Sequence, residues 1–401
     1  MNLVLYTHPE FLASHSHANF AAMLVKAYTA RGHSVELRQP KAVVRRLLPD
    51  GPWAKWAGYV DQYVLFPWQI GQSLSRDSVD TLYVFCDQAL GPWMPYICSR
   101  PHVVHCHDLM ALRSALGEIP QNPTSFTGRL YQRYIRWGFR HARHFISVSR
   151  KSQLDLHRFG AVRALTSEVV YNGLNYPYVR VAGDVARQRL TQAGLPADER
   201  GCLLHVGGGQ WYKNTSGVLA LYDQYARGVL RVAGAPLPLW VVGPPATAQL
   251  QQQLAGLPAQ ACVRFFQRLD TSTLEAAYSH AHALLFPSLA EGFGWPIAEA
   301  MACGCPVVTT DEAPMNEVGG DAAIYLPRLS GAAQLAEWSQ LGAATLQAAL
   351  DRDPMEIDRA RAAGCEQARR FNADAAIDKY LSIYRRVLAS DTEISTAPVL
   401  P

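Results

Sequence analysis

Long apolar runs, an export signal and a cysteine framework are all missing from this 401-residue sequence. No uninterrupted apolar stretch approaches the roughly 20 residues that a membrane-spanning helix requires. A strand-like run begins almost at Met1, which leaves no room for a secretory signal and argues against a periplasmic binding protein. Cys303 and Cys305 lack a second Cys or His pair at zinc spacing, so we interpret them as structural. We expect a cytoplasmic protein without a membrane span or a metal.

Charged residues are few, at 17% of the chain, while 49% of the residues are hydrophobic. This composition is typical of a well-packed globular protein. A chain of this length exceeds what one core usually supports, so we expect two domains of about 150–200 residues. The net charge is uneven: residues 1–180 hold 20 Lys and Arg against 11 Asp and Glu, and residues 181–401 hold 17 against 22, giving +9 and −5. The N-terminal half should therefore face an anionic partner.

Both halves alternate strand-like and helix-like stretches, which predicts an α/β fold with two doubly wound parallel sheets. The clearest early helix is 19–31, stopped by Gly32. We expect domains at 1–178 and 201–372, a linker at 179–200, a helix at 373–389 that can cross back to the first domain, and a tail at 390–401. The expected strands are 3–6, 34–37, 81–86, 103–106, 144–148 and 169–172, then 203–206, 239–242, 263–266, 283–287, 306–309 and 323–326.

The segment 287–306 carries the strongest signal. It reads as a strand end, a glycine-containing loop, and a short helix opened by Pro296 at its first position. Trp295 then occupies the cap position, so the first N–H groups of the helix are left for an anionic ligand, and Gly292 and Gly294 let it approach the backbone.

Two carboxylates flank this loop, Glu291 before it and Glu299 in the first helical turn. Each can accept hydrogen bonds from the vicinal hydroxyls of a sugar. Taken singly, each also has a plain explanation, Glu291 as a solvated loop residue and Glu299 as a glutamate favoured by the helix dipole.

A second glycine-rich loop, Gly207-Gly208-Gly209, lies between an apolar strand and a helix that starts near Asn214. Its N–H groups can cradle phosphates, and Lys213 adds a positive charge there. The alternative for Lys213 is an exposed lysine that precedes a helix. A nicotinamide-binding motif is disfavoured, because it would need glycine at Tyr212 and an acidic residue where Gly243 ends the next strand.

His107 and Asp108 follow a predicted strand, at the sheet edge where open α/β folds bind ligands. The alternative is a histidine satisfied by Asp108 or by a backbone carbonyl.

A helix expected at 127–145 places five arginines on one face. That face is either solvated or in contact with anionic headgroups or a lipid diphosphate, and the Trp53/Trp56 region could extend it. The arginines are Arg129, Arg133, Arg136, Arg140 and Arg143.

Together these segments resemble glycosyltransferase family 4, also called glycosyl transferases group 1, a retaining family with the GT-B fold. Seven residues separate Glu291 from Glu299 around Gly-Phe-Gly-Trp-Pro, as in the family signature. The resemblance covers about residues 80–330. Six more segments match in order: Cys106-His107-Asp108-Leu109, Ser147-Val148-Ser149, Val170-Tyr171-Asn172-Gly173, Val206-Gly207 with Lys213-Asn214, Val242-Gly243, and Pro314 to Gly319.

The resemblance implies two Rossmann-like domains facing across a cleft, the first for the acceptor and the second for the nucleotide sugar. The implied reaction moves a mannose-type or glucose-type hexose, with retention, from a nucleoside diphosphate to a saccharide or polyprenyl-diphosphate-linked acceptor in bacterial cell-surface polysaccharide synthesis. It needs no metal and no cofactor. GDP-mannose and UDP-hexoses fit equally well. The enzyme would be cytoplasmic, and peripheral on the inner face of the membrane if the arginine face binds there.

The resemblance also assigns residues. Catalytic roles fall to His107, Lys213 and Glu291, and acceptor contacts to His17 and Asp108. Tyr212 and Gly208 stand where the family often has basic residues, which leaves Lys213 as the cation. Asp351-Arg352-Asp353, the one Asp-x-Asp, is interpreted as a helix boundary. An epimerase or a phosphorylase of the same architecture is the alternative. The donor-binding residues are Gly207, Gly208, Gly243, Gly292, Phe293, Gly294, Ile297 and Glu299.

Overall fold

The computed structural model describes the backbone of residues 1–12, 15–48 and 51–396, and the side chains of 1–12, 18–48, 51, 53–390. The chain divides into two compact units. Unit 1 comprises Met1–Gly173 with the C-terminal segment from Ala373, and unit 2 comprises Leu174–Asn372. Each unit holds one parallel six-stranded sheet. The expected α/β fold with two doubly wound sheets is therefore confirmed.

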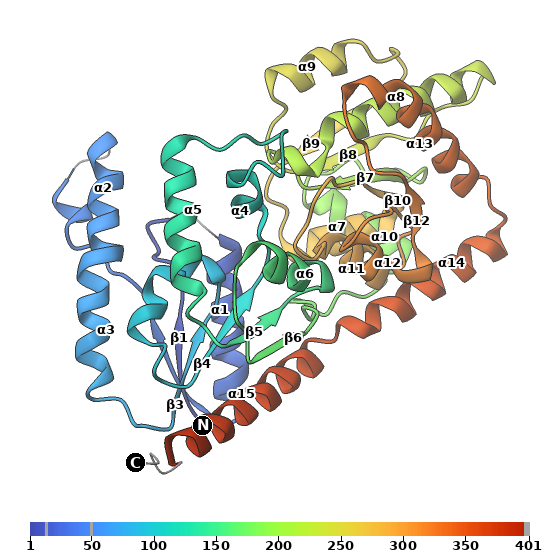
Figure 1. The fold of residues 1–401 in the computed structure, drawn as a ribbon. Coiled ribbons are helices and arrows are strands. Elements are labelled where there is room, and N and C mark those ends of the chain that lie inside the picture. Colours follow the sequence, from blue (N-terminus) through green and yellow to red (C-terminus); the bar gives the residue numbers. More distant parts are fainter. Residues whose placement is uncertain (13–14, 49–50, 397–401) are drawn as a thin grey trace. The chain divides into compact units, whose positions relative to one another are not determined.

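The sheet of unit 1 has the strand order β2-β1-β3-β4-β5-β6 (Figure 1). Successive side chains of a strand point to opposite faces, so Leu3 and Leu5 join one core while Val4 and Tyr6 join the other. The strands are β1 Asn2–Tyr6, β2 Ser34–Arg38, β3 Thr81–Phe85, β4 His102–Cys106, β5 His144–Ser147 and β6 Thr166–Val169. The helices are α1 His15–Ala30, α2 Pro52–Val60, α3 Phe66–Leu74, α4 Met110–Ala115, α5 Phe126–Phe139, α6 Arg150–Phe159 and α15 Ala373–Thr396.

Several elements of unit 1 differ from the sequence predictions. Helix α1 begins at His15, before the expected residue 19, and α15 runs to Thr396, into the segment expected as a tail. The strand expected at 169–172 is β6, which lies earlier, because its residues Thr166–Val169 pair with β5. The helix expected at 127–145 ends at Phe139, because residues from Phe145 onward pair with β4 as part of strand β5. Arg140 is therefore the C-cap residue of α5, and Arg143 lies beyond the helix, where its guanidinium donates to the carbonyl oxygen of Cys98. Only three of the five arginines share the helix.

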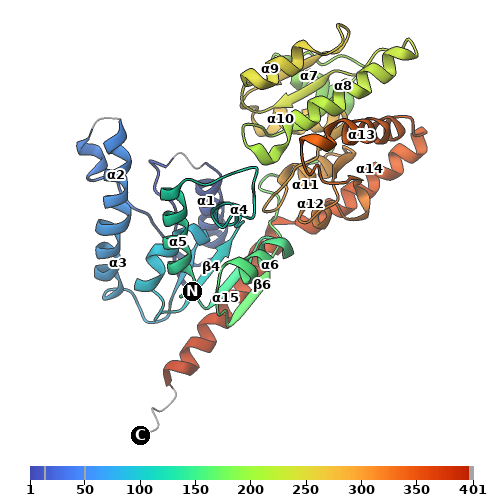
Figure 2. The same ribbon diagram turned by 45° about the horizontal axis from the view of Figure 1, so that its top comes forward.

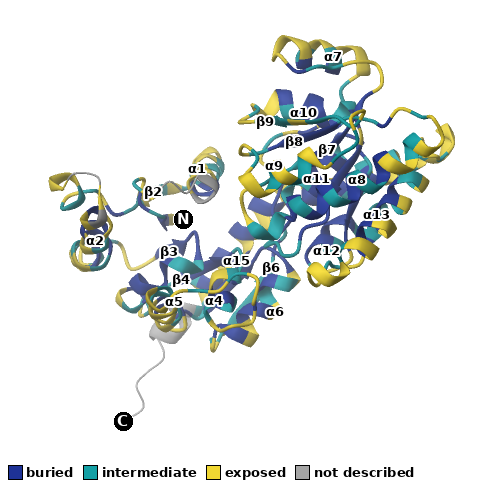
Figure 3. Cartoon of the chain, turned by 90° about the horizontal axis from the view of Figure 1, so that it is seen from above, coloured by how far each residue is buried: buried dark blue, intermediate teal, exposed yellow. Residues whose placement is uncertain are grey.

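The sheet of unit 2 has the order β12-β11-β10-β7-β8-β9, with its core on Leu203, Val241, Leu285 and Val308. Its four central strands are largely buried, and the outer faces of helices such as α13 are exposed (Figure 3). The strands are β7 Cys202–Val206, β8 Leu239–Val242, β9 Val263–Phe266, β10 Ala281–Phe286, β11 Val307–Thr310 and β12 Ile324–Leu326. The helices are α7 Gly183–Gln192, α8 Thr215–Arg231, α9 Ala248–Ala255, α10 Thr271–His280, α11 Trp295–Ala302, α12 Met315–Gly319, α13 Leu335–Leu350 and α14 Pro354–Ala368.

The segment 179–200, expected as a linker, contains helix α7 and belongs to unit 2. The reason is a buried carboxylate on α10: Glu275 accepts a hydrogen bond from the Val179 amide at 3.0 Å and pairs with Arg189 on α7, also at 3.0 Å. Ala186 and Leu190 of α7 are fully buried as well.

Helix α15 packs in unit 1, where Tyr384 receives a hydrogen bond from Tyr28 at 3.0 Å. In the described part of the chain, no helix is both long and apolar enough to cross a bilayer.

Candidate active site

A glycine loop follows strand β7. Gly207, Gly208 and Gly209 have φ angles of +119°, +152° and +81°, which side chains other than glycine rarely adopt. A Cβ on Gly243, at the end of β8, would lie 2.8 Å from the Gly207 carbonyl oxygen. These glycines therefore let the loop lie directly on the backbone at the carboxyl ends of β7 and β8.

Lys213 ends a 3-10 turn between this loop and α8. Asn214 follows in the left-handed region, with φ of +56°, and its side-chain amide donates to the Pro287 carbonyl oxygen at 3.0 Å. The Leu289 amide in turn donates to the Tyr212 carbonyl oxygen at 2.7 Å. These two bonds tie the lysine turn to the loop after β10, so two segments more than 70 residues apart in sequence form one site.

Lys213 and Glu291 form an ion pair. The ammonium nitrogen lies 2.8 Å from the Oε1 atom of Glu291, and the two side chains are only 15% and 9% exposed. The same nitrogen stands 4.8 Å from the centroid of the Phe286 ring. A charge-assisted hydrogen bond so shielded from water is strong. Both carboxylate and cation are therefore held in place, and an incoming anion must compete with Glu291 for the lysine.

Helix α11 begins one residue earlier than the sequence suggested. Its N-cap is Gly294, with φ of +100°, and Trp295 is the first helical residue, so the placing of Trp295 at the cap was wrong. The reason is that only glycine adopts this backbone conformation without strain. As expected, no side chain caps the helix. The Ile297 amide, however, donates to the Gly294 carbonyl oxygen at 3.0 Å, so that amide is engaged within the turn.

Phe293 anchors the loop before α11. The side chain is 3% exposed, and its ring packs edge-on against Trp295 and Phe371, with centroids 5.5 and 5.3 Å away. Ile297 is fully buried. Both side chains are therefore packed inside unit 2, and a donor contact at Phe293 or Ile297 stays a prediction about their backbone.

Glu299 is a buried carboxyl group, 8% exposed, that accepts a hydrogen bond from the Tyr278 hydroxyl at 2.8 Å. Burial raises the pKa of Glu299 from 4.5 to about 7, against the opposing effects of Tyr278 and Lys213. Tyr278, on α10, was missed in the sequence, because nothing in a lone helical tyrosine indicates that its hydroxyl will meet a carboxylate. The carboxyl is poised to change its charge near neutral pH.

The raised pKa of Glu299 predicts that the protein becomes less stable as pH rises. Between pH 4.5 and 7 the folded state binds more protons at Glu299 than the unfolded state, so the free energy of unfolding should fall as pH rises. We expect Glu299→Gln to match the wild type near pH 4.5 and to exceed it above pH 7, by on the order of 3 kcal/mol. Urea unfolding at pH 5 and pH 8 measures the free energy of unfolding of both proteins. The same change between the two pH values in the wild type and in Glu299→Gln would contradict the prediction.

His205, on β7, was also missed in the sequence and links the elements that carry the site. Its Nδ1 donates to the Leu285 carbonyl oxygen at 2.8 Å, and its Nε2 lies 3.2 Å from the Thr215 hydroxyl. Burial lowers the pKa of His205 to about 4, so the ring stays neutral and joins β7 to β10 and α8.

In unit 1, a backbone carbonyl oxygen and the Gln88 side chain hold His107. Its Nε2 donates to the Cys86 carbonyl oxygen at 2.9 Å, and its amide donates to the Gln88 side chain at 3.0 Å. Asp108 accepts from the Met110 amide at 2.9 Å. The side chain of His17 lies outside the described residues.

A second histidine, His8, lies at this sheet edge and was not predicted from the sequence. His8 follows β1, and its Nε2 lies 2.8 Å from a carboxylate oxygen of Asp87, which follows β3 and is 3% exposed. The available signal was position, because both residues come directly after buried strands whose ends meet at one edge. His8, Asp87 and His107 therefore share the carboxyl edge of the sheet.

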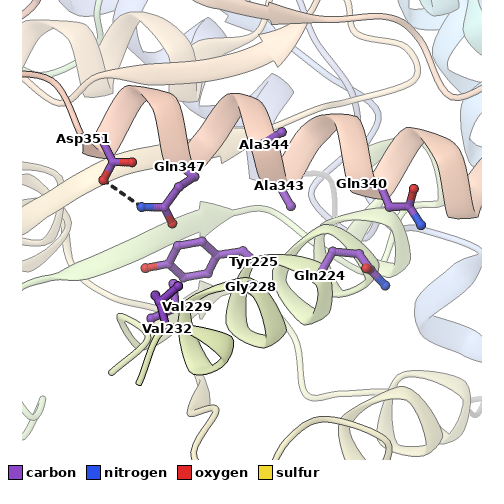
Figure 4. Close-up of a pocket in the computed structure, with 10 residues that line it drawn as sticks. All are labelled: Gln224, Tyr225, Gly228, Val229, Val232, Gln340, Ala343, Ala344, Gln347 and Asp351. Carbon is purple, nitrogen blue, oxygen red and sulfur yellow. Dashed lines mark hydrogen bonds between the residues drawn. The ribbon is translucent and has the colours of Figure 1, made fainter. Parts of the chain in front are cut away.

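The described residues contain no group of three His, Cys, Asp or Glu arranged to hold a metal ion. Asp353 caps α14 in a capping box and Asp351 ends α13, so the interpretation of Asp351-Arg352-Asp353 as a helix boundary is confirmed. A groove of about 510 Å³ lies between α8 and α13. Figure 4 shows Tyr225 and the Gln347–Asp351 hydrogen bond along it, and none of the candidate site residues lines it.

Two α/β units, with a glycine loop, a lysine and two glutamates at one sheet edge of the second, define a glycosyltransferase built from Rossmann-like domains. Residues 17–176 match the family described as Glycosyltransferase Family 4, and residues 201–338 match the family described as Glycosyl transferases group 1. The chain belongs to this glycosyltransferase family.

Proteins of similar sequence are also glycosyltransferases. An O-antigen chain mannosyltransferase of Salmonella typhimurium is 39% identical over 77 residues, which are 19% of this chain and 22% of that protein's length. A phosphatidyl-myo-inositol mannosyltransferase of Mycobacterium leprae is 27% identical over 306 residues, covering 74% of this chain and 76% of its own. The sucrose-phosphate synthase of Thermosynechococcus elongatus superposes with a TM-score of 0.70 at 19% identity, covering 97% and 100% of the two chains. That similarity shows the fold.

Proposed function

We propose that this protein transfers a mannose-type or glucose-type hexose from a nucleoside diphosphate to a hydroxyl group of a saccharide or lipid-linked acceptor, with retention at the anomeric carbon. One observation carries the proposal: the shielded pair of Lys213 and Glu291 lies beside a glycine loop at the carboxyl edge of the unit 2 sheet. Two mannosyltransferases among the similar proteins support the choice of a hexose.

The donor diphosphate would lie against Gly207 and Gly208, whose backbone leaves room for phosphate oxygens. As the bond to the sugar breaks, negative charge grows on the diphosphate, and Lys213 would leave Glu291 to stabilise it. Glu291, released from the lysine, would accept hydrogen bonds from the hexose. Glu299 would accept hydrogen bonds from the ribose hydroxyls, with Tyr278 keeping its carboxyl in place.

Retention needs no carboxylate that attacks the sugar. In the pathway we propose, the departing phosphate accepts the proton of the acceptor hydroxyl on the same face of the ring. Lys213 is the cation of this mechanism, in place of a metal. His107, in unit 1, would meet the reacting hexose, and the bond from its Nε2 to Cys86 orients the ring.

The acceptor and the location complete the proposal. We assign the acceptor to unit 1, with Asp108 as a contact, and the pathway to cell-surface polysaccharide synthesis at the inner face of the cytoplasmic membrane. The excess of positive charge in residues 1–180 supports an anionic partner there. The exposed arginines of α5, Arg129 and Arg133, remain candidates for that contact.

Thermal-shift screening against GDP-, UDP- and dTDP-sugars tests the donor. We expect one base to raise the melting temperature well above the others. Transfer with that donor should then give a product whose anomeric configuration, measured by NMR, equals that of the donor. An inverted product would overturn the retaining assignment. Conversion of the donor without any acceptor would favour the epimerase.

A further inference from the structure

An exposed apolar stripe runs along the outer helix of unit 1. Helix α2, the π-helical turn Asp61–Leu65 and α3 follow one another without a break. Exposed apolar residues recur along them at intervals of three, four, four and four, which places them on one face. Their exposed fractions are 73% for Trp53, 59% for Trp56, 38% for Val60, 60% for Val64 and 63% for Trp68. Such a contiguous patch, with three tryptophans in solvent, marks an interaction site.

The opposite face of this helix is firmly packed. Phe66 and Ile70 lie in the core of unit 1. The buried Asp61 carboxylate accepts hydrogen bonds from the amides of Val43, Val44 and Arg45, at 3.2, 2.8 and 3.0 Å. The stripe therefore faces outward on a fixed helix.

Helix α5 carries a second stripe, at intervals of four, four and three. Phe126 is 74% exposed, Leu130 46%, Tyr134 38% and Trp137 45%. The rings of Tyr134 and Trp137 stack with centroids 5.9 Å apart. The two stripes together make up what we call the aromatic face.

Contacts between the helices show that both stripes look to the same side. Tyr59 meets Tyr131 and Tyr63 meets Tyr134, with ring centroids 5.8 and 5.5 Å apart, so the helices run parallel. They lie side by side in both views (Figures 1 and 2). Each residue turns an α-helix by about 100°. On α2, Val60 follows the contact residue Tyr59 by one position, so the stripe is rotated by about 100° in one sense from the side that faces α5. On α5, Leu130 precedes the contact residue Tyr131 by one position, so its stripe is rotated by about 100° in the opposite sense. Because the two parallel helices face each other, opposite rotations turn both stripes to the same side.

The charge around the aromatic face has one sign. Within residues 51–74 and 126–139 the single acidic residue is Asp61, which is buried. Lys55, Arg129 and Arg133 are exposed on the same helices, and Arg46 is exposed just before them. Tryptophan and aliphatic side chains flanked by cations suit the boundary between headgroups and acyl chains of an anionic bilayer.

We propose that the aromatic face inserts into an anionic membrane surface, with the tryptophans of α2 and α3 as anchors. The inference deepens the proposed function, since it places unit 1 where a lipid-linked acceptor would be found. Binding to lipid itself does not depend on the transfer reaction.

Vesicle flotation with the full chain tests this inference. We expect binding to vesicles of phosphatidylcholine with phosphatidylglycerol, and at least about tenfold weaker partitioning for the triple variant Trp53→Ser/Trp56→Ser/Trp68→Ser. A blue shift of tryptophan fluorescence should accompany wild-type binding. Arg129→Gln/Arg133→Gln should weaken binding to the mixed vesicles and reduce its salt dependence. The matched control is Val232→Ser/Leu341→Ser/Met355→Ser, which removes three exposed apolar residues from unit 2 and should bind as wild type.

Three results would overturn the inference. The tryptophan variant could partition onto vesicles as strongly as the wild type, or the wild type could bind vesicles of phosphatidylcholine alone as strongly as the mixed vesicles. The third is a wild type that forms an oligomer and a tryptophan variant that is monomeric. The last would identify the face as a protein interface. Thermal shift with sugar nucleotides should be unchanged in the tryptophan variant. If the wild type floats with anionic vesicles yet transfers no hexose, the membrane inference stands and the proposed function fails.

Discussion

Replacing Lys213 by methionine is expected to lower kcat for hexose transfer by about 10²–10³-fold, the usual effect of removing one group that stabilises developing negative charge. Methionine keeps an unbranched apolar stem, one atom shorter, but lacks the ammonium group, so the ion pair with Glu291 and the contact of that nitrogen with the Phe286 ring are both lost. Steady-state kinetics with the preferred sugar nucleotide measure the effect.

A lysine in a similar setting provides the control for this prediction. Lys151 on α6 is 26% exposed and pairs with Asp155, as Lys213 is 15% exposed and pairs with Glu291. Lys151→Met should leave kcat within about twofold of the wild type, as expected for a pair with no charge to stabilise in the transition state. Equal kcat for Lys213→Met and the wild type would remove this lysine from the mechanism.

Glu299→Ala should raise KM for the donor by roughly 10–100-fold with a smaller change in kcat, because hydrogen bonds to a charged group typically contribute about 1.5–3 kcal/mol. We assign those bonds to the ribose, which does not react, so their loss weakens binding of the ground state and transition state alike. Initial rates over a range of donor concentrations separate KM from kcat.

Tyr278→Phe is the companion variant, since it removes the hydroxyl that donates to the Glu299 carboxyl and keeps the buried ring. It should raise KM less than Glu299→Ala. It should also raise the pKa of Glu299 further, because the hydrogen bond from Tyr278 lowers that pKa. The pH at which KM changes should therefore shift to a higher value. A Glu299→Ala enzyme with wild-type KM would exclude Glu299 from donor binding.

The strands could be predicted because parallel strands covered on both faces consist of short apolar runs. All twelve strands of the two sheets lie at or next to a predicted run. Errors arose where local pattern and tertiary pairing disagree. Arginine spacing continued a helix through residue 145, but the pairing of His144 with β6 ends it. Residues 179–200 looked like a linker, because the carboxylate of Glu275 that secures them is almost 100 residues away.

The candidate site was located by position in the sequence, since its residues follow strands whose ends meet at one sheet edge. The partners of those residues were not visible in the same way. Glu291 pairs with a lysine 78 residues away, and Tyr278 reaches Glu299 from another helix. The His107 ring is hydrogen-bonded to the carbonyl oxygen of Cys86, directly after the neighbouring strand β3. Such contacts depend on crossing distances and side-chain directions, and no local pattern encodes them.

By itself, the sequence determined the fold class, the family, and the glycines, lysine and glutamates at the edge of the second sheet, because apolar periodicity and residue order are local properties. Only the tertiary structure decided which of these residues are paired, which are buried and which charge they carry. The physical reason is that desolvation and ion pairing depend on everything that surrounds a group in space. The pKa of Glu299 near 7 and the outward tryptophans of α2 and α3 both have this origin.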